Sequence, residues 1–137
     1  MWKRESSNVL IIEDSNNSNL TLRSILKIGQ YSIQSAFSDL GINQIVEKEP
    51  EVIILTLPLQ KRNGFEILKT LKRDVQTKHI PVLIITKLNT QMYWDAACRM
   101  GTDAYLVTPD HYPYLFNRLN KLRKKNKNFF IENTIAI

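Results

Sequence analysis

The sequence has few of the residues that would point to a disulfide-stapled, secreted or membrane-spanning protein. Its 137 residues include one cysteine, four glycines and five prolines. The single cysteine, Cys98, cannot form a disulfide within the chain, which agrees with a reducing compartment. No apolar run approaches the roughly 20 residues that a membrane-spanning helix needs. The apolar stretch in the opening MWKRESSNVLII is too short for a secretory signal. These absences favour a cytoplasmic globular protein.

Acidic residues are also in short supply. The chain has 19 Lys and Arg against 13 Asp and Glu, so its formal net charge is +6. The excess is concentrated in residues 117–128, where no acid offsets the cations Arg118, Lys121, Arg123, Lys124, Lys125 and Lys127. Such a cluster is either the solvated face of a final helix or a surface that attracts nucleic acid or an acidic partner.

The chain alternates strand-like and helix-like segments from one end to the other. The strand candidates are Asn8–Ile12, Tyr31–Phe37, Val52–Leu55, Pro81–Thr86 and Ala104–Val107. The helix candidates are residues 19–29, 40–49, 64–72, 90–101 and 112–124. Strands that alternate with helices predict right-handed βαβ crossovers and a mainly parallel sheet covered on both faces. The final FFIENTIAI, residues 129–137, does not fit this plan; an extra strand, a dimer contact and the start of a linker all stay open.

Four segments of the chain resemble the receiver domain of bacterial response regulators. They are IIED, EVIILT with the following NGFEIL, IPVLIIT and GTDAYLVTP, and they occur in the family's order and spacing. The resemblance covers about Asn8 to Arg123. It implies a CheY-like, flavodoxin-like (βα)5 fold, a doubly wound parallel five-stranded α/β sheet with strand order 2-1-3-4-5 and helices on both faces. We therefore expect a receiver-like domain over residues 1–125 and a tail or linker start over residues 126–137.

The resemblance also implies a site at the carboxyl ends of the strands. A receiver takes a phosphoryl group onto an aspartate after its third strand, beside an acidic pair that holds Mg²⁺, a hydroxyl residue and a lysine. Glu13 and Asp14 match the acidic pair, Thr86 matches the hydroxyl position and Pro109 matches the proline that follows the lysine. Tyr105 matches the aromatic residue that switches between buried and exposed rotamers.

Two positions of that site depart from the family's pattern. Thr56 stands where the phosphoacceptor aspartate belongs, and Thr108 stands where the lysine belongs. A threonine hydroxyl stays protonated near neutral pH unless a base activates it, and it removes a negative ligand for Mg²⁺. Thr108 supplies a hydrogen bond but no positive charge. We therefore expect acyl-phosphate formation to be lost in a degenerate pseudo-receiver. The loop proline also falls early, at Pro58, which leaves Gln60 where the family usually has it.

The residues that remain have two interpretations each. Glu13 and Asp14 are weak metal-ligand candidates, or they cap the first helix and pair with nearby cations. Lys61, Arg62 and Lys87 are candidate counter-charges that replace Mg²⁺ and the missing lysine, or they are simply solvated. We expect Tyr105 to have one locked rotamer rather than to act as a live switch, and Cys98 to be buried in its helix. Neither Tyr105 nor Cys98 is therefore expected to take part in a chemical reaction.

The first functional hypothesis is a non-enzymatic, phosphorylation-independent protein-interaction module in two-component signal transduction or transcriptional regulation. Its protein partner, or a second copy in a homodimer, would bind through the last two helices and the fifth strand. A second hypothesis is a divergent receiver that still binds Mg²⁺ or an anion as a ligand-gated switch. A third is nucleic-acid binding, with Lys121, Arg123, Lys124, Lys125 and Lys127 as the basic residues. No resident cofactor and no membrane contact are expected.

Overall fold

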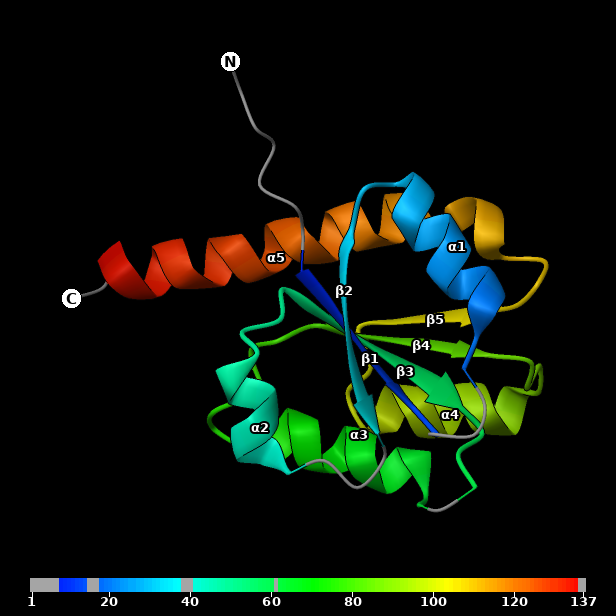
Figure 1. Ribbon diagram of the computed structural model, residues 1–137. Helices are drawn as coiled ribbons and strands as arrows, with labels where there is room; N and C mark the ends of the chain where they lie inside the picture. Colours follow the sequence, from blue (N-terminus) through cyan, green and yellow to red (C-terminus); the bar gives the residue numbers. More distant parts are fainter. Residues whose placement is uncertain (1–7, 15–17, 38–40, 61, 136–137) are drawn as a thin grey trace.

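Five short strands form the centre of the computed structural model (Figure 1). The structure describes residues 8–14, 18–37, 41–60 and 62–135, and the side chains of its last helix as far as residue 125. The strands are β1 (Asn8–Glu13), β2 (Ser32–Phe37), β3 (Val52–Leu57), β4 (Val82–Thr86) and β5 (Ala104–Val107). The helices are α1 (Leu20–Ile28), α2 (Ile42–Glu47), α3 (Gly64–Arg73), α4 (Gln91–Arg99), the 3-10 turn η1 (Tyr112–Tyr114) and α5 (Leu115–Ile135).

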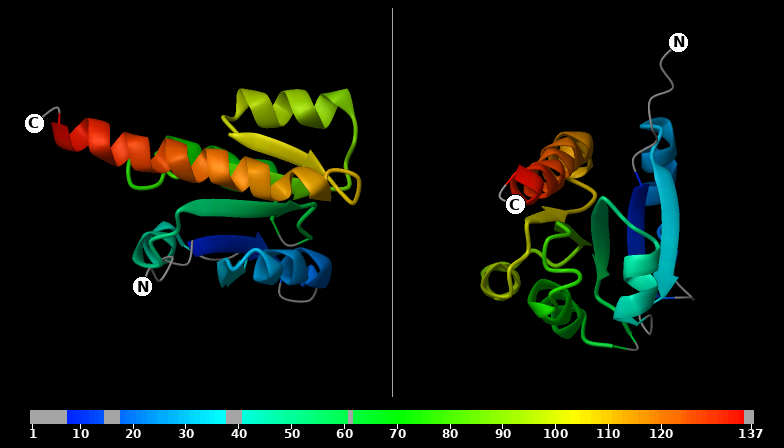
Figure 2. Two further views of the ribbon diagram at one scale, coloured as in Figure 1. Left: turned by 90° about the horizontal axis from the view of Figure 1, so that it is seen from above. Right: turned by 90° about the vertical axis from the view of Figure 1, so that its left-hand side faces the viewer.

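All strand pairs are parallel and the order in the sheet is β2-β1-β3-β4-β5, which confirms the predicted topology. Helices α1 and α5 cover one face, whereas α2, α3 and α4 cover the other (Figures 1 and 2). The two faces have separate apolar clusters, one against each helical layer. Because β1, β3 and β4 are covered on both sides, nearly every residue in them is buried, as the unbroken apolar runs in the sequence predict.

Polar side chains begin the helices where the sequence offers cap residues. Asn19, the last residue of the predicted capping segment SNNSN, accepts a hydrogen bond from the Leu22 N–H at 3.0 Å. Asn63 accepts one from the Phe65 N–H, also at 3.0 Å, at the start of α3. Gly101 follows α4 with a φ of 93°, a left-handed conformation that favours glycine.

Gly29 ends α1 as predicted, but the reason lies elsewhere in the chain. Its φ is −77°, and the left-handed residue is the next one, Gln30, with a φ of 63°. A Cβ built on Gly29 would lie 2.5 Å from Cε1 of Phe116. A side chain at position 29 would therefore have to displace the ring of Phe116, which also stacks on Tyr31.

Helix α5 differs most from the prediction. The sequence predicts a helix over residues 112–124, but α5 continues to Ile135 and extends past the sheet in Figure 1. The extra-strand interpretation of residues 129–137 is wrong for residues 129–135, which are helical; residues 136 and 137 lie outside the described residues. The predicted boundary between residues 125 and 126 falls inside α5. Among the side chains of this helix that the structure describes, up to residue 125, Leu115, Leu119 and Leu122 are buried.

Two smaller properties complete the fold. Cys98 is exposed on α4, so the expectation that it is buried is wrong. The neighbouring Ala97 is the residue of α4 that faces the core, because the apolar side of this short helix is narrow. Within the described part of the chain, none of the helices combines the length and the apolarity that crossing a bilayer would require.

Candidate functional site

The carboxyl ends of the strands surround an open cavity of about 500 Å³. Five predicted site residues meet in its lining, namely Asp14, Thr56, Thr86, Lys87 and Thr108. Asn19 and Tyr112 also line it, and the Asn19 amide donates to the Tyr112 hydroxyl at 3.3 Å. Glu13, Tyr105 and Arg62 are not among the described lining residues, and Lys61 lies outside the described residues. Parallel strands place their carboxyl ends at one edge, where ligands of such sheets bind.

Three threonines lie at the strand ends: Thr56 and Thr108 stand at the two positions where the resemblance implies charged groups, and Thr86 stands at the hydroxyl position. The Thr56 hydroxyl donates to the carbonyl oxygen of Ile12 at 2.9 Å, so it links β3 to β1. The Thr86 hydroxyl oxygen accepts from the Leu88 N–H at 3.0 Å. Thr108 is 7% exposed, and no hydrogen bond joins its hydroxyl to a described residue. The Thr56 hydroxyl donates its proton to a backbone carbonyl rather than to a base. The hydroxyl is therefore not activated as a nucleophile.

The two acids at the end of β1 have different partners. Glu13 is buried and forms an ion pair with Arg23 of α1, while its other oxygen accepts from the Asn19 N–H at 3.3 Å. Arg23 also donates to the Ser35 hydroxyl at 2.8 Å. Asp14 accepts from the Gln60 N–H at 2.7 Å, which holds the loop after β3 against the end of β1. Glu13 is thus neutralised by a fixed arginine on the side of α1, away from the cavity.

Sequence reasoning missed Arg23. Its position four residues after Asn19 indicates which side of α1 it occupies, because residues four apart share a helix face. Its partner follows only from the way α1 lies on β1 and β2. Arg23 therefore supplies a counter-charge for Glu13 that is not among the predicted replacements for Mg²⁺ and the missing lysine, namely Lys61, Arg62 and Lys87.

The donor set fits Mg²⁺ poorly. Among the described residues there is no group of three His, Cys, Asp or Glu side chains that could hold a metal ion. Mg²⁺ in proteins is usually bound by one or two carboxylates with near-octahedral oxygen geometry. Asp14 is the one described carboxylate that lines the cavity. Glu13 is paired with Arg23 instead. Thr56 stands at the position where the resemblance implies a third acidic ligand. The residues present therefore do not complete the metal site that the resemblance implies.

Tyr105 lies beside the cavity rather than in it. Its hydroxyl donates to the Leu88 carbonyl at 2.8 Å, and Trp94 packs edge-on against its ring at 5.5 Å between centroids. Burial, together with the nearby Tyr93, raises the pKa of Tyr105 above its ordinary value. Leu88 connects the two predicted positions, because its N–H donates to Thr86 while its carbonyl accepts from Tyr105. Tyr105 is thereby held inward in this structure.

The basic residues of α5 are partly used within the domain. Arg123 donates to Glu51 and Lys125 donates to Asp103, each at 2.9 Å. Arg118, Lys121 and Lys124 are exposed, and the side chain of Lys127 lies outside the described residues. The predicted nucleic-acid surface is thus interrupted by two ion pairs.

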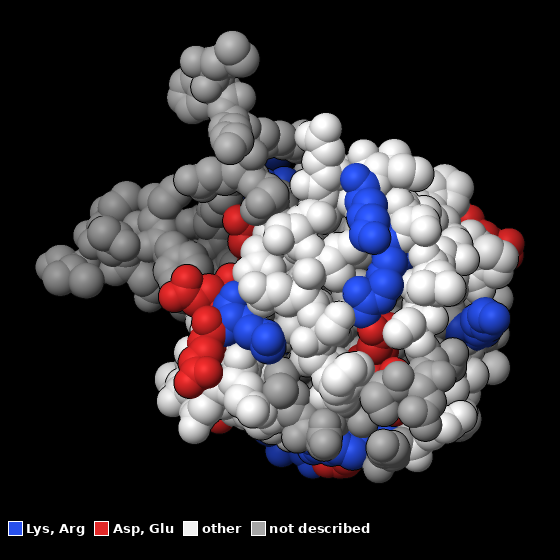
Figure 3. Space-filling model, viewed as in Figure 1, with Lys and Arg blue, Asp and Glu red and all other residues white. Residues whose placement is uncertain are grey.

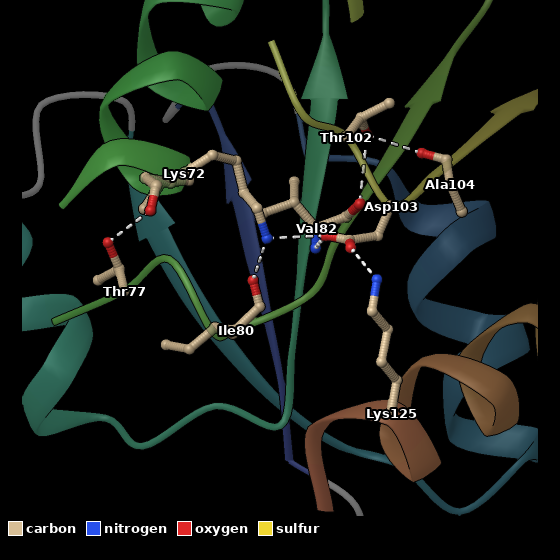
Figure 4. Close-up of polar contacts among 9 residues, drawn as sticks. Lys72, Thr77, Ile80, Val82, Thr102, Asp103, Ala104 and Lys125 are labelled. Carbon is tan, nitrogen blue, oxygen red and sulfur yellow. Dashed lines mark hydrogen bonds and ion pairs between the residues drawn. The ribbon is translucent and has the colours of Figure 1, made fainter. Parts of the chain in front are cut away.

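Asp103 is the centre of the polar cluster in Figure 4. Its carboxylate accepts from Lys72 of α3 at 2.9 Å, from the Val82 N–H at 2.8 Å and from Lys125 of α5 at 2.9 Å. Burial by itself raises the pKa of Asp103, but these hydrogen bonds outweigh it and hold the pKa below its ordinary value. The cluster joins two helices to the start of β4 at the end of the sheet opposite the cavity.

The sheet order and the strand-end cavity define a doubly wound α/β domain with the arrangement of a receiver. A profile of the response regulator receiver domain matches residues 9–120. The chain therefore belongs to the response regulator receiver domain family.

Known proteins agree with this assignment. The chain is 30% identical over 118 residues to the DNA-binding dual master transcriptional regulator RpaA of Synechocystis, an alignment that covers 85% of this chain and 49% of RpaA. It is 27% identical to Protein PilH of Pseudomonas aeruginosa, covering 82% of this chain and 93% of PilH. Among solved structures, a response regulator receiver domain protein from Clostridium thermocellum is similar with a TM-score of 0.75 and 22% identity, covering 90% of this chain and 98% of that one. At that identity the structure supports the fold alone.

The chain spans about half or less of the length of three curated relatives, RpaA among them. What those proteins do as whole molecules is therefore separate from what the shared domain does.

Proposed function

We propose that this domain is a pseudo-receiver, a non-enzymatic interaction module that works without phosphorylation. The observation that carries the proposal is Thr56, whose hydroxyl occupies the phosphoacceptor position and donates to the Ile12 carbonyl at 2.9 Å. A hydroxyl in that arrangement has neither the charge of a carboxylate nor a base to remove its proton. Thr108 adds support, because it cannot neutralise a phosphoryl group as a lysine would.

The charges of the site support a fixed state. Arg23 neutralises Glu13 permanently, so this acid needs no metal ion to remain buried. The proposed counter-charge role of Lys61, Arg62 and Lys87 then concerns Asp14, since Lys87 lines the same cavity. Tyr105 is held by the Leu88 carbonyl, and we expect this single rotamer to persist because no phosphoryl group pulls on Thr86.

The proposed output surface comprises α4, β5, η1 and the start of α5. Trp94 of α4 is 44% exposed and Tyr114 of η1 is 58% exposed, and Met92 of α4 is exposed as well. Trp94, Tyr105 and His111 border a second, smaller cavity of about 230 Å³. Large aromatic side chains at a pocket are typical of the residues that dominate protein–protein binding. A regulatory protein partner in the cytoplasm, or a second copy of the chain, would bind here.

A phosphorylation test addresses the first half of the proposal. The ¹⁵N-labelled protein is mixed with Mg²⁺ and beryllium fluoride, and separately with acetyl phosphate, while amide shifts are followed and intact mass is measured. We expect unchanged amide shifts at Asp14, Thr86 and Tyr105 and no added phosphoryl mass. A phosphoryl adduct, or shifts that saturate at these residues, would contradict the proposal.

A binding test addresses the second half. Trp94→Ala and Tyr114→Ala should each weaken binding to a partner recovered by co-purification by about tenfold, because a truncated aromatic hot spot costs about 1.4 kcal/mol or more. Val75→Ala is the control, since Val75 is also an exposed apolar side chain, at 73%, but lies between α3 and β4. Equal effects of all three changes would place the partner elsewhere.

One observation favours the ligand-gated alternative. Thr108 has no described hydrogen-bond partner for its hydroxyl, and it lines the cavity with Thr86 and Lys87. These groups offer two hydroxyls and one ammonium to an anion. Titration with inorganic phosphate, with and without Mg²⁺, separates the alternatives: saturable shifts at Thr108 and Thr86 would support anion gating, and Thr108→Val should abolish them.

The nucleic-acid alternative has weaker support, since Arg123 and Lys125 are already in ion pairs. It requires retention on duplex DNA that falls with salt and with neutralisation of Lys121 and Lys124.

A further inference from the structure

The backbone groups at the two edges of the sheet have different hydrogen-bond partners. At the β5 edge, His111 bonds to both backbone groups of Val107, the last residue of the strand. The Val107 N–H donates to Nδ1 of His111 at 2.8 Å, and the Val107 carbonyl accepts from the His111 N–H at 2.9 Å. Strand β5 is also only four residues long. At the other edge, β2 has six residues, and no described residue bonds to the backbone groups on its outer side.

Strand β2 also lacks the devices that usually protect an edge. Its sequence, SIQSAF, contains no charged residue and no proline. Its register with β1 is continuous from Asn8↔Ser32 to Glu13↔Phe37, so no bulge interrupts it. Natural proteins usually blunt long edges with charges, prolines, bulges or a covering segment, because an open edge pairs readily with another strand. Within the described residues, β2 has none of these.

The surroundings of β2 are positively charged on the α1 side. Arg23 donates to the Ser35 hydroxyl, and Lys27 is exposed in the last turn of α1. Figure 3 shows a column of Lys and Arg side chains near the boundary between α1 and β2, with an uncharged surface on its left and Asp or Glu side chains at its lower end. Phe37 is 48% exposed at the carboxyl end of the strand. Because side chains alternate, Phe37 lies on the same face of β2 as Ser35.

We propose that the outer edge of β2 binds an extended, acidic segment of a protein partner as a sixth strand of the sheet. Backbone hydrogen bonds to every second residue of β2 would provide the affinity. Acidic side chains at alternate positions would face the exposed Lys27, and an apolar residue on the same side would pack on Phe37. A second copy of this chain fits less well, because a two-fold pairing of β2 would bring the basic sides of the two α1 helices together.

The probe is an acetylated, fluorescein-labelled peptide, Thr-Glu-Thr-Glu-Thr-Val, titrated into the full chain at low salt; its two Glu residues and its Val lie on one face of the added strand. We expect saturable binding by fluorescence anisotropy, and weaker binding by about fivefold or more when Gln replaces both Glu residues. Lys27→Glu should weaken binding of the acidic peptide by about fivefold, the effect of reversing one rim charge. The matched control is Lys124→Glu, an equal charge change on exposed α5, which should leave binding within about twofold.

Amide hydrogen exchange distinguishes strand addition from loose electrostatic contact. Alternate amides of β2 should exchange about tenfold more slowly with the peptide bound, since they become hydrogen-bonded. The same peptide with N-methyl groups at alternate residues should not bind, and this control leaves the protein unchanged.

Absence of binding, binding without protection of β2, or protection at α4 and β5 would each overturn the proposal. Protection of β2 by self-association, seen in sedimentation without peptide, would show that a second copy is the occupant. This surface is separate from the α4 and α5 surface, so either proposal can fail alone.

Discussion

Thr56 shows at the scale of one residue how the site differs from that of a phosphorylated receiver. Thr56→Asp removes the donor to the Ile12 carbonyl and adds a carboxylate to a cavity that already contains Asp14. We expect a loss of about 1–2 kcal/mol in the free energy of unfolding, measured by urea denaturation. Adding Thr108→Lys should recover part of that loss, because both side chains line one cavity.

Thr56→Ser is the matched control, since it keeps the hydroxyl and should cost much less. Full stability of Thr56→Asp alone would contradict the structural role assigned to this hydroxyl.

Arg23 is the second residue whose loss should be diagnostic. Arg23→Met would leave Glu13, with a side chain only 2% exposed, as a buried charge without its cation. Breaking a buried pair from one side costs about 3–5 kcal/mol, so we expect a large fall in the urea midpoint. Adding Glu13→Gln to Arg23→Met should restore most of the stability, because the uncompensated charge is then gone. If the single change costs less than about 1 kcal/mol, Arg23 is not the counter-charge of Glu13.

Asp103 acts at the scale of elements, since it joins α3, β4 and α5 (Figure 4). Asp103→Asn should lower the free energy of unfolding by about 2–4 kcal/mol near neutral pH, because Lys72 and the Val82 N–H lose a charged acceptor. The folded-state pKa of Asp103 is below its ordinary value of 3.8. Its stabilisation is therefore complete above that value and is lost as pH falls through the lower folded pKa.

Urea denaturation at several pH values checks this prediction. The difference between the wild type and Asp103→Asn should shrink steadily in acid below about pH 4. Lys125→Gln is the control, because the Lys125 side chain is 69% exposed and its ion pair should contribute under about 1 kcal/mol. A difference that grows in acid would mean that the sign of the pKa shift is wrong.

The sequence predicted the elements well where apolar spacing alone determines them. The run AYLV matches β5 residue for residue, and GFEILKTLK matches α3 within one residue of its end. The two threonines of the site were also recognised, because parallel strands bring their ends together whatever the side chains are. What was missed depends on contacts between distant segments: Arg23 with Glu13, Asp103 with Lys125, and Phe116 with Gly29. Local periodicity contains no information on such pairings.

At the scale of the whole molecule, the length of α5 bears on where the folded domain ends. The sequence predicts a domain over residues 1–125, although α5 continues to Ile135. The described side chains that attach α5 to the rest of the chain include Leu115, Leu119 and Leu122 in the core, Phe116 stacked on Tyr31, and Arg123 and Lys125 in ion pairs. All six lie before residue 126. A chain that stops after Lys125 keeps all of these attachments.

We therefore expect a chain ending at Lys125 to unfold cooperatively with a free energy within about 1 kcal/mol of the full length, in thermal and urea denaturation followed by circular dichroism. A chain ending at Arg118 would lose two buried leucines and both ion pairs. Removing each buried leucine costs about 2–5 kcal/mol, which together approaches the whole stability of a small domain. This shorter chain should be largely unfolded at 25 °C. If the longer truncation also unfolds, the distal turns of α5 belong to the core, and the domain boundary must move toward Ile135.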